Sequence, residues 1–242
     1  MLRFGLLGRN ISYSFSRGYF SEKFSREGIS ATYENFDLQE LSQFSEVLKK
    51  NPDLKGLNVT IPYKEQIIPF LDELDPVAAE IGAVNTIKFT EDHKLVGFNT
   101  DHFGFAEAIR PHLKPHHKKA LILGTGGASK AVHYALKTLD INVHFVSRSA
   151  GKNFSYEDLG KTLFSEHTVI VNCTPLGTFP NTDQYPPVPV QLFTSQHLVF
   201  DLIYNPPQTK LMELARKKGA TAVNGQKMLE FQAEKAWEIW NS

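Results

Sequence analysis

The sequence is poor in cysteine, balanced in charge and free of long apolar runs. Its single cysteine, Cys173, excludes an internal disulfide and is typical of a reducing compartment. Equal numbers of basic and acidic side chains, 26 of each, argue against a nucleic-acid partner bound through a basic surface. No apolar stretch approaches the roughly 18 residues that cross a bilayer, and the apolar start of the chain is too short for a signal peptide. We therefore expect a cytoplasmic enzyme with neither a membrane nor a nucleic-acid partner.

Strand-like and helix-like runs alternate from one end of the chain to the other. Short runs rich in Val, Ile, Leu and Phe predict strands at 2–7, 31–36, 55–59, 84–89, 119–123, 142–147, 168–172, 198–202 and 220–223. Helices are predicted at 16–27, 38–50, 101–113, 127–139, 207–218 and 226–240. Alternation of this kind predicts an α/β fold with mostly parallel sheets. The length of 242 residues suits one large domain or two small ones.

A polar stretch at residues 114–119 separates a predicted helix from the next strand and places a domain boundary near 101–118. No carboxylate cluster lies near the histidines of this region in the sequence, so we interpret them as solvated linker residues rather than zinc ligands: His112, His116 and His117. Residues 174–197 predict a long loop, and loops of that length are often functional. Cys173, just before it, has no recognisable base partner and is interpreted as a small buried packing residue.

The segment 121–132 runs from an apolar strand through a glycine turn into a helix. Gly124 and Gly126 permit a tight turn and let backbone N–H groups approach a pyrophosphate at the helix N-terminus. Ser129 stands where the usual dinucleotide-binding turn has a third glycine. A glycine-rich turn without a ligand is the alternative that any short motif leaves open.

The next predicted strand indicates which dinucleotide suits this turn. NAD-binding proteins usually place Asp or Glu on the ribose 2′-OH, but residues 141–156 contain no acidic side chain. Arg148 and Lys152, flanked by Ser147 and Ser149, suit a 2′-phosphate because a guanidinium group binds phosphate oxygens in pairs. A solvated basic turn is the alternative; beside the glycine turn, the pattern favours NADP.

Two hydroxyls follow the first predicted strand, at Ser14 and Ser16. In an extended segment alternate residues share a face, so this pair is expected to hold one carboxylate. A helix N-cap at Ser16, opening a helix over 17–27, is a compatible second interpretation.

Polar residues also stand at what we interpret as the ends of short strands in the N-terminal half, or in the turn just after: Asn58, Lys64, Asn85 and Asp101. Since ligands of open α/β sheets bind outside the carboxyl ends of strands, these side chains are expected to converge on one crevice. Each alone is more readily a turn residue or a surface charge. A lysine oriented by a carboxylate can supply the proton when a nicotinamide hydride reduces a ketone, and amides and hydroxyls suit a substrate with several OH groups.

Eight segments, in this order along the chain, resemble the motifs of the shikimate dehydrogenases. They are residues 14–16, 58–64, 82–86, 97–101, 124–128, 172–177, 201–206 and 224–232. Eight collinear matches across almost the whole chain are far more specific than one glycine turn.

This resemblance implies a fold of two domains, an N-terminal α/β substrate domain and a Rossmann-like NADP-binding domain, with a deep cleft between them. The substrate domain is discontinuous, comprising residues 1–101 and 226–242, and the NADP domain comprises residues 102–225. The implied activity is the reversible, NADP-dependent reduction of 3-dehydroshikimate to shikimate, an oxidoreductase step of chorismate and aromatic amino-acid biosynthesis. We expect a monomer or a homodimer that binds no metal.

The resemblance also implies roles for individual residues, with Lys64 and Asp101 as the catalytic pair. The implied substrate-binding residues are Ser14, Ser16, Asn58, Thr60, Lys64, Asn85, Asp101, Tyr204 and Gln232. The implied NADP-binding residues are Gly124, Thr125, Gly126, Gly127 and Ala128 at the pyrophosphate, Ser147, Arg148, Ser149 and Lys152 at the 2′-phosphate, and Leu202 and Gly225 at the nicotinamide.

The first motif departs from the family pattern, because Asn10, Tyr13 and Arg17 stand where Pro, His and Pro are usual. Two other functions share the fold. One is a quinate or shikimate dehydrogenase that uses NAD or accepts a broader range of polyol acids, which the changed first motif favours and Arg148 opposes. The other is a non-catalytic dinucleotide-binding sensor, which the presence of both Lys64 and Asp101 opposes.

Overall fold

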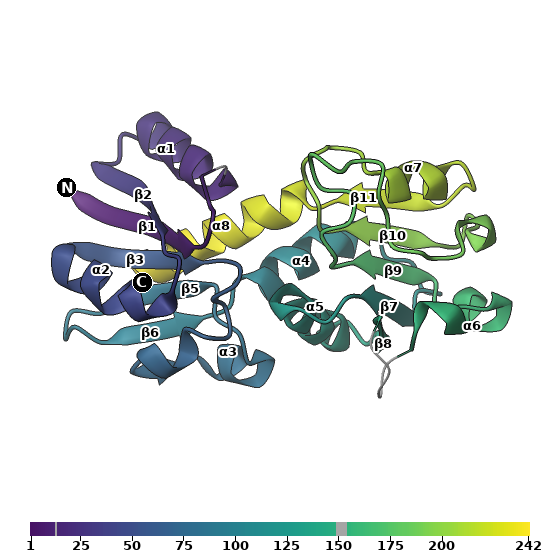
Figure 1. Ribbon diagram of the computed structural model, residues 1–242, viewed down its shortest axis with the longest axis horizontal. Helices are drawn as coiled ribbons and strands as arrows, with labels where there is room; N and C mark the ends of the chain where they lie inside the picture. Colours follow the sequence, from purple (N-terminus) through teal and green to yellow (C-terminus); the bar gives the residue numbers. More distant parts are fainter. Residues whose placement is uncertain (13, 149–153) are drawn as a thin grey trace. The chain divides into compact units, whose positions relative to one another are not determined.

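The structure, a computed structural model, describes residues 1–12, 14–148 and 154–242 and divides into two compact units. Unit 1 comprises Met1–Thr100 and Ala233–Ser242, and unit 2 comprises Asp101–Gln232 (Figure 1). Packing thus divides the last helix at residue 232, whereas the predicted substrate domain takes all of it from residue 226. None of the helices in the described part of the chain is both long and apolar enough to span a membrane.

Unit 1 contains a six-stranded mixed sheet in the order β2-β1-β3-β5-β6-β4. Its strands are β1 (Leu2–Gly8), β2 (Ala31–Asp37), β3 (Leu54–Val59), β4 (Glu73–Leu74), β5 (Thr86–Phe89) and β6 (Leu95–Phe98). Strand β1 pairs in parallel with β2 and β3, and β4 pairs in parallel with β6. Strand β5 runs antiparallel to both β3 and β6, so the beginning of β5 lies beside the ends of two other strands.

Both faces of this sheet are buried, because successive side chains of a strand point to opposite faces. Phe4 and Leu6 of β1 pack with α1 (Phe15–Glu27) and with the last turns of α8 (Gln226–Asn241). Leu7 faces the other side, in a cluster with α2 (Phe44–Lys50), α3 (Pro76–Ile81) and the turns that follow β3.

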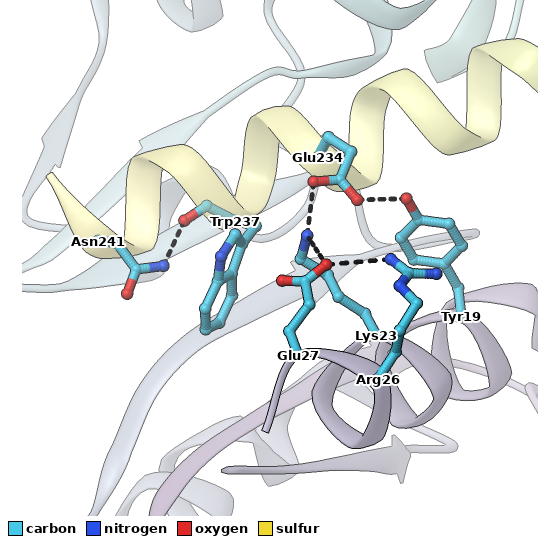
Figure 2. Close-up of polar contacts among 7 residues, drawn as sticks. All are labelled: Tyr19, Lys23, Arg26, Glu27, Glu234, Trp237 and Asn241. Carbon is cyan, nitrogen blue, oxygen red and sulfur yellow. Dashed lines mark hydrogen bonds and ion pairs between the residues drawn. The ribbon is translucent and has the colours of Figure 1, made fainter. Parts of the chain in front are cut away.

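Polar contacts reinforce the packing of α1 on α8 (Figure 2). Lys23 is only 6% exposed, and its ammonium group lies 2.8 Å from a carboxylate oxygen of Glu234 and 3.1 Å from one of Glu27. The hydroxyl of Tyr19 donates to the second oxygen of Glu234. Burial of Lys23 opposes its charge, but the hydrogen bonds that it donates to Glu234 and Glu27 prevail and raise its pKa.

Unit 2 contains a five-stranded sheet in the order β11-β10-β9-β7-β8, and every pairing is parallel. Its strands are β7 (Lys119–Leu123), β8 (Asn142–Val146), β9 (Val169–Asn172), β10 (Leu198–Asp201) and β11 (Thr221–Asn224). Successive strands extend the sheet on opposite sides of β7, so a topological switch point lies between β7 and β9. Ligands of doubly wound sheets bind at the carboxyl ends of the strands beside such a point.

Helices cover both faces of the parallel sheet, as its continuous apolar strands require. Helices α4 (Asp101–Ile109) and α5 (Gly127–Thr138) pack on one face with the start of α8. Helices α6 (Lys161–Glu166) and α7 (Lys210–Arg216) pack on the other. Short 3-10 helices complete the chain at Leu41–Gln43, Ile68–Phe70, Arg110–His112, Tyr156–Asp158 and Val190–Leu192.

The structure confirms the α/β class and corrects several elements. Strands β4 and β6 and helices α3 and α6 were not predicted, and each is six residues or shorter. Helix α3 had readable end signals, because Asp75 caps it through the N–H groups of Val77 and Ala78, and Gly82 ends it in the left-handed conformation.

The prediction that all three linker histidines are solvated was wrong for His117, which is buried. Its Nδ1 accepts from the N–H of Lys114, and its Nε2 lies 3.1 Å from the carbonyl oxygen of Gln196. The linker folds back so that both ring nitrogens have backbone partners, which sequence composition does not reveal.

Candidate functional site

The glycine turn connects β7 to α5 at the switch point of unit 2. Gly124 has a φ of 99°, a conformation that side chains disfavour, and its N–H donates to the carbonyl oxygen of Val146. Gly126 is the N-cap of α5, and a Cβ placed on it would meet nothing within 4 Å. Thr125 and Gly126 are exposed, so the N-terminus of α5 is open to an anion.

Ser129, at the missing third glycine, is buried with its hydroxyl satisfied. Its Oγ donates to the carbonyl oxygen of Gly126 at 2.6 Å, and its N–H donates to the same oxygen at 2.9 Å. The serine therefore closes the first turn of α5 from within and leaves the exposed side of the glycine turn unobstructed.

The predicted 2′-phosphate residues follow β8, the strand next to β7. Ser147 is buried, and its N–H donates to the carbonyl oxygen of Phe154, whereas Arg148 is exposed. Burial raises the pKa of the nearby Tyr156 phenol, and the charge of Arg148 opposes that rise. Ser149 and Lys152 lie outside the described residues.

Leu202 and Gly225, both predicted for the nicotinamide, lie directly against each other. A Cβ on Gly225 would come within 2.1 Å of the carbonyl oxygen of Leu202, so only glycine fits there. The N–H of Gly225 donates to the carbonyl oxygen of Ile203. The loop after β10 and the start of α8 are thereby joined. Tyr204 follows in the same loop and is half-buried.

A fully buried carboxylate, Asp201, holds this loop in place. Its oxygens accept from Asn172 Nδ2 at 3.0 Å, from the N–H of Ile203 at 3.1 Å and from Thr209 Oγ1 at 2.6 Å. Burial raises the pKa of Asp201 to about 6, although these three hydrogen bonds oppose the shift. Asp201 was not predicted as a site residue, although it begins one of the eight matching segments.

Cys173 is half-buried and packs against the core of unit 2. Burial raises the pKa of its thiol, so the reactive thiolate is disfavoured. This agrees with a packing role, although the side chain is less enclosed than expected.

In unit 1, Asn58 and Asn85 belong to one buried cluster of polar side chains. Asn58 Nδ2 donates to the carbonyl oxygen of Asn85 and to Thr86 Oγ1, each at 3.2 Å. Asn85 Nδ2 donates to Thr100 Oγ1 at 3.0 Å, and the N–H of Thr100 donates back to Asn85 Oδ1 at 2.6 Å.

We expected Asn58 and Asn85 to lie close together because both were placed at the carboxyl ends of parallel strands, and that reason was wrong. The strands β3 and β5 are antiparallel, so Asn58 at the end of β3 lies opposite Thr86 at the start of β5. Antiparallel pairing likewise places Thr86 opposite Phe98 at the end of β6. Asn85 therefore precedes its strand instead of following it.

Thr60 and Lys64 follow β3, and Asp101 begins α4. Lys64 is half-buried in the turns after β3, and its carbonyl oxygen accepts from the N–H of Val84 at 2.7 Å, one residue before Asn85. Thr60 is half-buried, and its N–H donates to the carbonyl oxygen of Leu7. Asp101 is buried at the first position of α4.

The extended segment predicted around Ser14 and Ser16 was wrong, because helix α1 begins at Phe15. Ser14 is its N-cap residue, whose side chain accepts no capping hydrogen bond, and Ser16 lies in the first turn. Both serines are half-buried. Tyr13 lies outside the described residues, and Arg17 is exposed.

Gln232 is buried on α8 close to Gly104 of α4. Its Nε2 donates to the carbonyl oxygen of Leu229 at 3.0 Å. A Cβ on Gly104 would lie 2.9 Å from the Gln232 backbone nitrogen and 2.5 Å from the Met228 carbonyl oxygen. Glycine at 104 thus permits the close approach of the two helices.

Sequence reasoning missed three members of the unit 1 cluster, Thr86, Thr100 and Tyr33. Thr86 and Thr100 lie inside the matching segments 82–86 and 97–101, and that position was the available signal. Tyr33, from the middle of β2, donates to Asn58 Oδ1 at 2.8 Å. No local motif marks Tyr33, because its partner lies two strands away in the sheet.

The parallel sheet, its glycine turn at the switch point and an exposed arginine after the neighbouring strand define a Rossmann-type α/β protein with a second α/β unit. The family model described as the shikimate dehydrogenase substrate binding domain matches residues 6–87. A Clostridium botulinum protein named shikimate dehydrogenase (NADP(+)) is 38% identical, with 98% of this chain and 95% of that protein covered. The chain belongs to the shikimate dehydrogenase family.

Solved structures of the family resemble the fold of this protein over almost the whole chain. A shikimate dehydrogenase in complex with NADP+ has a TM-score of 0.90 at 33% identity, covering 99% of this chain and 90% of that one. The Thermus thermophilus shikimate 5-dehydrogenase in complex with NADP(H) and shikimate has a TM-score of 0.86 at 30% identity, covering 99% and 93%.

Proposed function

We propose that this protein is an NADP-dependent oxidoreductase that reversibly reduces 3-dehydroshikimate to shikimate, in chorismate and aromatic amino-acid biosynthesis. The observation that carries the proposal is the 38% identity, over 98% of the chain, to a relative named for this activity and cofactor. The protein acts in the cytoplasm, as a monomer or a homodimer.

The cofactor residues proposed here all belong to unit 2 and suit a dinucleotide. The open N-terminus of α5 and the exposed glycine turn can take the pyrophosphate, through residues 124–128. Arg148, with Ser147, Ser149 and Lys152, takes the 2′-phosphate. Leu202 and Gly225 hold the nicotinamide ring, and the contact between them excludes any larger residue at 225.

The proposed substrate residues other than Tyr204 lie in the proposed substrate domain, residues 1–101 with 226–242, and Tyr204 lies in the proposed cofactor domain, residues 102–225. Ser14 and Ser16 hold the substrate carboxylate. The residues that bind the ring hydroxyls or line the site are Asn58, Thr60, Asn85, Asp101, Tyr204 and Gln232. The buried amides of Asn58 and Asn85 already have protein partners, so they are held in place before substrate arrives.

In this mechanism NADPH supplies the hydride that the carbonyl carbon of 3-dehydroshikimate receives. The Lys64–Asp101 pair supplies the proton that the carbonyl oxygen takes up, so the ketone becomes an alcohol. Lys64 binds that oxygen as its charge develops, and the Asp101 carboxylate orients the ammonium group. In the reverse direction the same pair removes the proton from the hydroxyl of shikimate.

The test is the formation of reduced cofactor by purified protein mixed with shikimate, with NADP and NAD in parallel and quinate as the control substrate. Turnover confined to shikimate and NADP supports the proposal. Turnover with quinate or NAD favours the broader dehydrogenase, and no turnover in a protein that still binds NADP favours the sensor.

Replacing the proposed proton donor tests the mechanism. We expect Lys64→Ala to lower kcat by about 10²–10⁴-fold while shikimate binding remains measurable, because general acid catalysis contributes about that factor. Lys55→Ala, at an exposed lysine of β3, is the matched control and keeps wild-type kcat. An unchanged kcat in Lys64→Ala removes Lys64 from the mechanism.

Replacing Arg148 tests the cofactor assignment. We expect Arg148→Ala to raise the KM for NADP by about tenfold, since a charged hydrogen bond to phosphate is lost, with little change for NAD. Arg110→Ala, at an exposed arginine of unit 2 paired with Glu107, serves as the control. Equal effects on NADP and NAD contradict the 2′-phosphate assignment.

A further inference from the structure

Tyr33 is a buried phenol joined to a proposed substrate-binding residue. It lies in the middle of β2, and its ring stacks on Phe20 with 4.7 Å between centroids. Its hydroxyl donates to Asn58 Oδ1 at 2.8 Å, and Asn58 is itself only 3% exposed. The ring of Tyr33 therefore contributes packing against Phe20, and its hydroxyl contributes a separate hydrogen bond to Asn58.

This bond determines which way the Asn58 amide faces. Asn58 Oδ1 receives the Tyr33 hydroxyl, while Nδ2 uses its two hydrogens on the Asn85 carbonyl and on Thr86 Oγ1. A primary amide has two donor hydrogens and two acceptor lone pairs. The one hydrogen-bonding position that these contacts leave on Asn58 is the second lone pair of Oδ1.

Tyr33 remains a donor throughout the working pH range. Burial raises the pKa of its phenol far above the ordinary value, and a hydrogen bond from Ser16 opposes that rise only in part. Ser16, which is proposed to hold the substrate carboxylate, is thereby linked through Tyr33 to Asn58.

We propose that Tyr33 is a positioning residue: its hydroxyl holds the Asn58 amide so that Oδ1 accepts a hydrogen bond from a ring hydroxyl of the substrate. The inference rests on the proposed function. It states which partner donates in the hydrogen bond between Asn58 and the substrate. The substrate group at Asn58 must be a donor, so a hydroxyl is accepted there and an ether or keto oxygen is disfavoured. A protein with phenylalanine at position 33 keeps the packing and loses this discrimination.

The experiment compares Tyr33→Phe with the wild-type protein in the shikimate assay. We expect the KM for shikimate to rise about tenfold, the cost of one buried hydrogen bond, with kcat within about twofold and an unchanged KM for NADP. The control is Tyr19→Phe, which removes a hydroxyl that donates to Glu234 in the same unit. It lowers thermal stability and leaves the KM for shikimate unchanged.

A double-mutant cycle separates positioning from general stabilisation. In an Asn58→Ala background, Tyr33→Phe should raise the KM for shikimate clearly less than it does in the wild-type background, because the effect through Asn58 is then absent and only the bond with Ser16 remains. If Tyr33→Phe raises the KM for shikimate by the same factor with and without Asn58→Ala, its role is structural and the inference is overturned. If Tyr33→Phe does not fold, Asn58→Ala alone decides, because an unchanged KM in that variant leaves Tyr33 nothing to act through.

The outcomes separate this inference from the proposed function. No turnover of shikimate by the wild-type protein overturns the proposed function and the inference together. Turnover by the wild type with the same KM for shikimate in Tyr33→Phe overturns the inference alone.

Discussion

Asn10 shows how one residue accommodates a departure from the family pattern. It has a φ of 55°, and its N–H donates to Asp37 Oδ1 at 2.8 Å, while the N–H of Ile11 donates to Asp37 Oδ2 at 3.1 Å. Proline, usual at this position in the family, has no N–H and a φ near −65°. The loop after β1 is therefore closed by Asp37 in a way that proline does not permit.

Restoring the family residue should consequently harm this protein. We expect Asn10→Pro to lower the free energy of unfolding by about 2 kcal/mol or more, from the lost hydrogen bond and the forced change of φ. Asn10→Gly, which keeps both the N–H and the left-handed conformation, should stay within about 0.5 kcal/mol of wild type. Urea denaturation measures both, and a fully stable Asn10→Pro contradicts this account of the loop.

Among the elements, α8 is the one that the two units share. Its first turns pack with α4, and its last turns cover the sheet of unit 1. Buried Lys23 ties α1 to Glu234, near the middle of α8, and α1 begins at the two serines proposed to hold the substrate carboxylate. The α1–α8 contact thus belongs to the packing that holds unit 1 together.

Glu234 and Glu238 form a matched pair for testing this contact. We expect Glu234→Ala to lower the free energy of unfolding by about 1–3 kcal/mol, because it leaves buried Lys23 with Glu27 alone and removes the acceptor of Tyr19. Glu238 pairs with Lys235 on the surface, so Glu238→Ala should cost about 0.5 kcal/mol or less. Equal losses in urea denaturation contradict the special role of Glu234.

At the scale of the whole molecule, the two units differ in the histidines whose pKa is lowered. Burial lowers the pKa of four histidines, all of them in unit 2: His117, His133, His167 and His197. When such a group unfolds, its pKa returns to about 6.5, so below that pH the unfolded state binds more protons than the native state. Unit 2 therefore loses stability as the pH falls from about 6.5.

Two other sets of groups define the pH window. The pKa of Asp201 is raised to about 6, so this one carboxyl takes up its proton in the native state and opposes the histidines. Carboxylates with lowered pKa values, such as Glu27 in unit 1 and Glu213 in unit 2, lose their contribution only below their ordinary pKa of 4.5. Between about pH 6.5 and 5 the four histidines dominate.

Spectroscopy can distinguish the units, because both tryptophans, Trp237 and Trp240, lie in the part of α8 that belongs to unit 1. In urea denaturation at pH 5.5, we expect the far-UV circular dichroism transition to begin at lower urea than the tryptophan fluorescence transition. At pH 7.5 the gap between the two should be smaller. Transitions that keep the same separation at both pH values contradict the proposed origin of the acid sensitivity.

Local sequence patterns determined much of this protein. The apolar run of β7, the glycine turn and the start of α5 were all predictable, because a buried parallel strand, a left-handed turn and a helix N-terminus each have their own residue signature. The family followed from the order of eight such segments. Ser14, Lys64 and Arg148 were identifiable as candidates because each stands within or beside a recognisable motif.

Only the tertiary structure decided which distant residues meet and which are buried. Asn58 and Asn85 converge through antiparallel pairing, Tyr33 reaches Asn58 across β1, and His117 is enclosed by a loop 79 residues away. Burial and strand partners depend on the whole packed chain, whereas composition and periodicity report only on neighbours along it. The sequence therefore indicates which side chains are candidates for the reaction, and the fold decides which of their atoms donate and which accept hydrogen bonds.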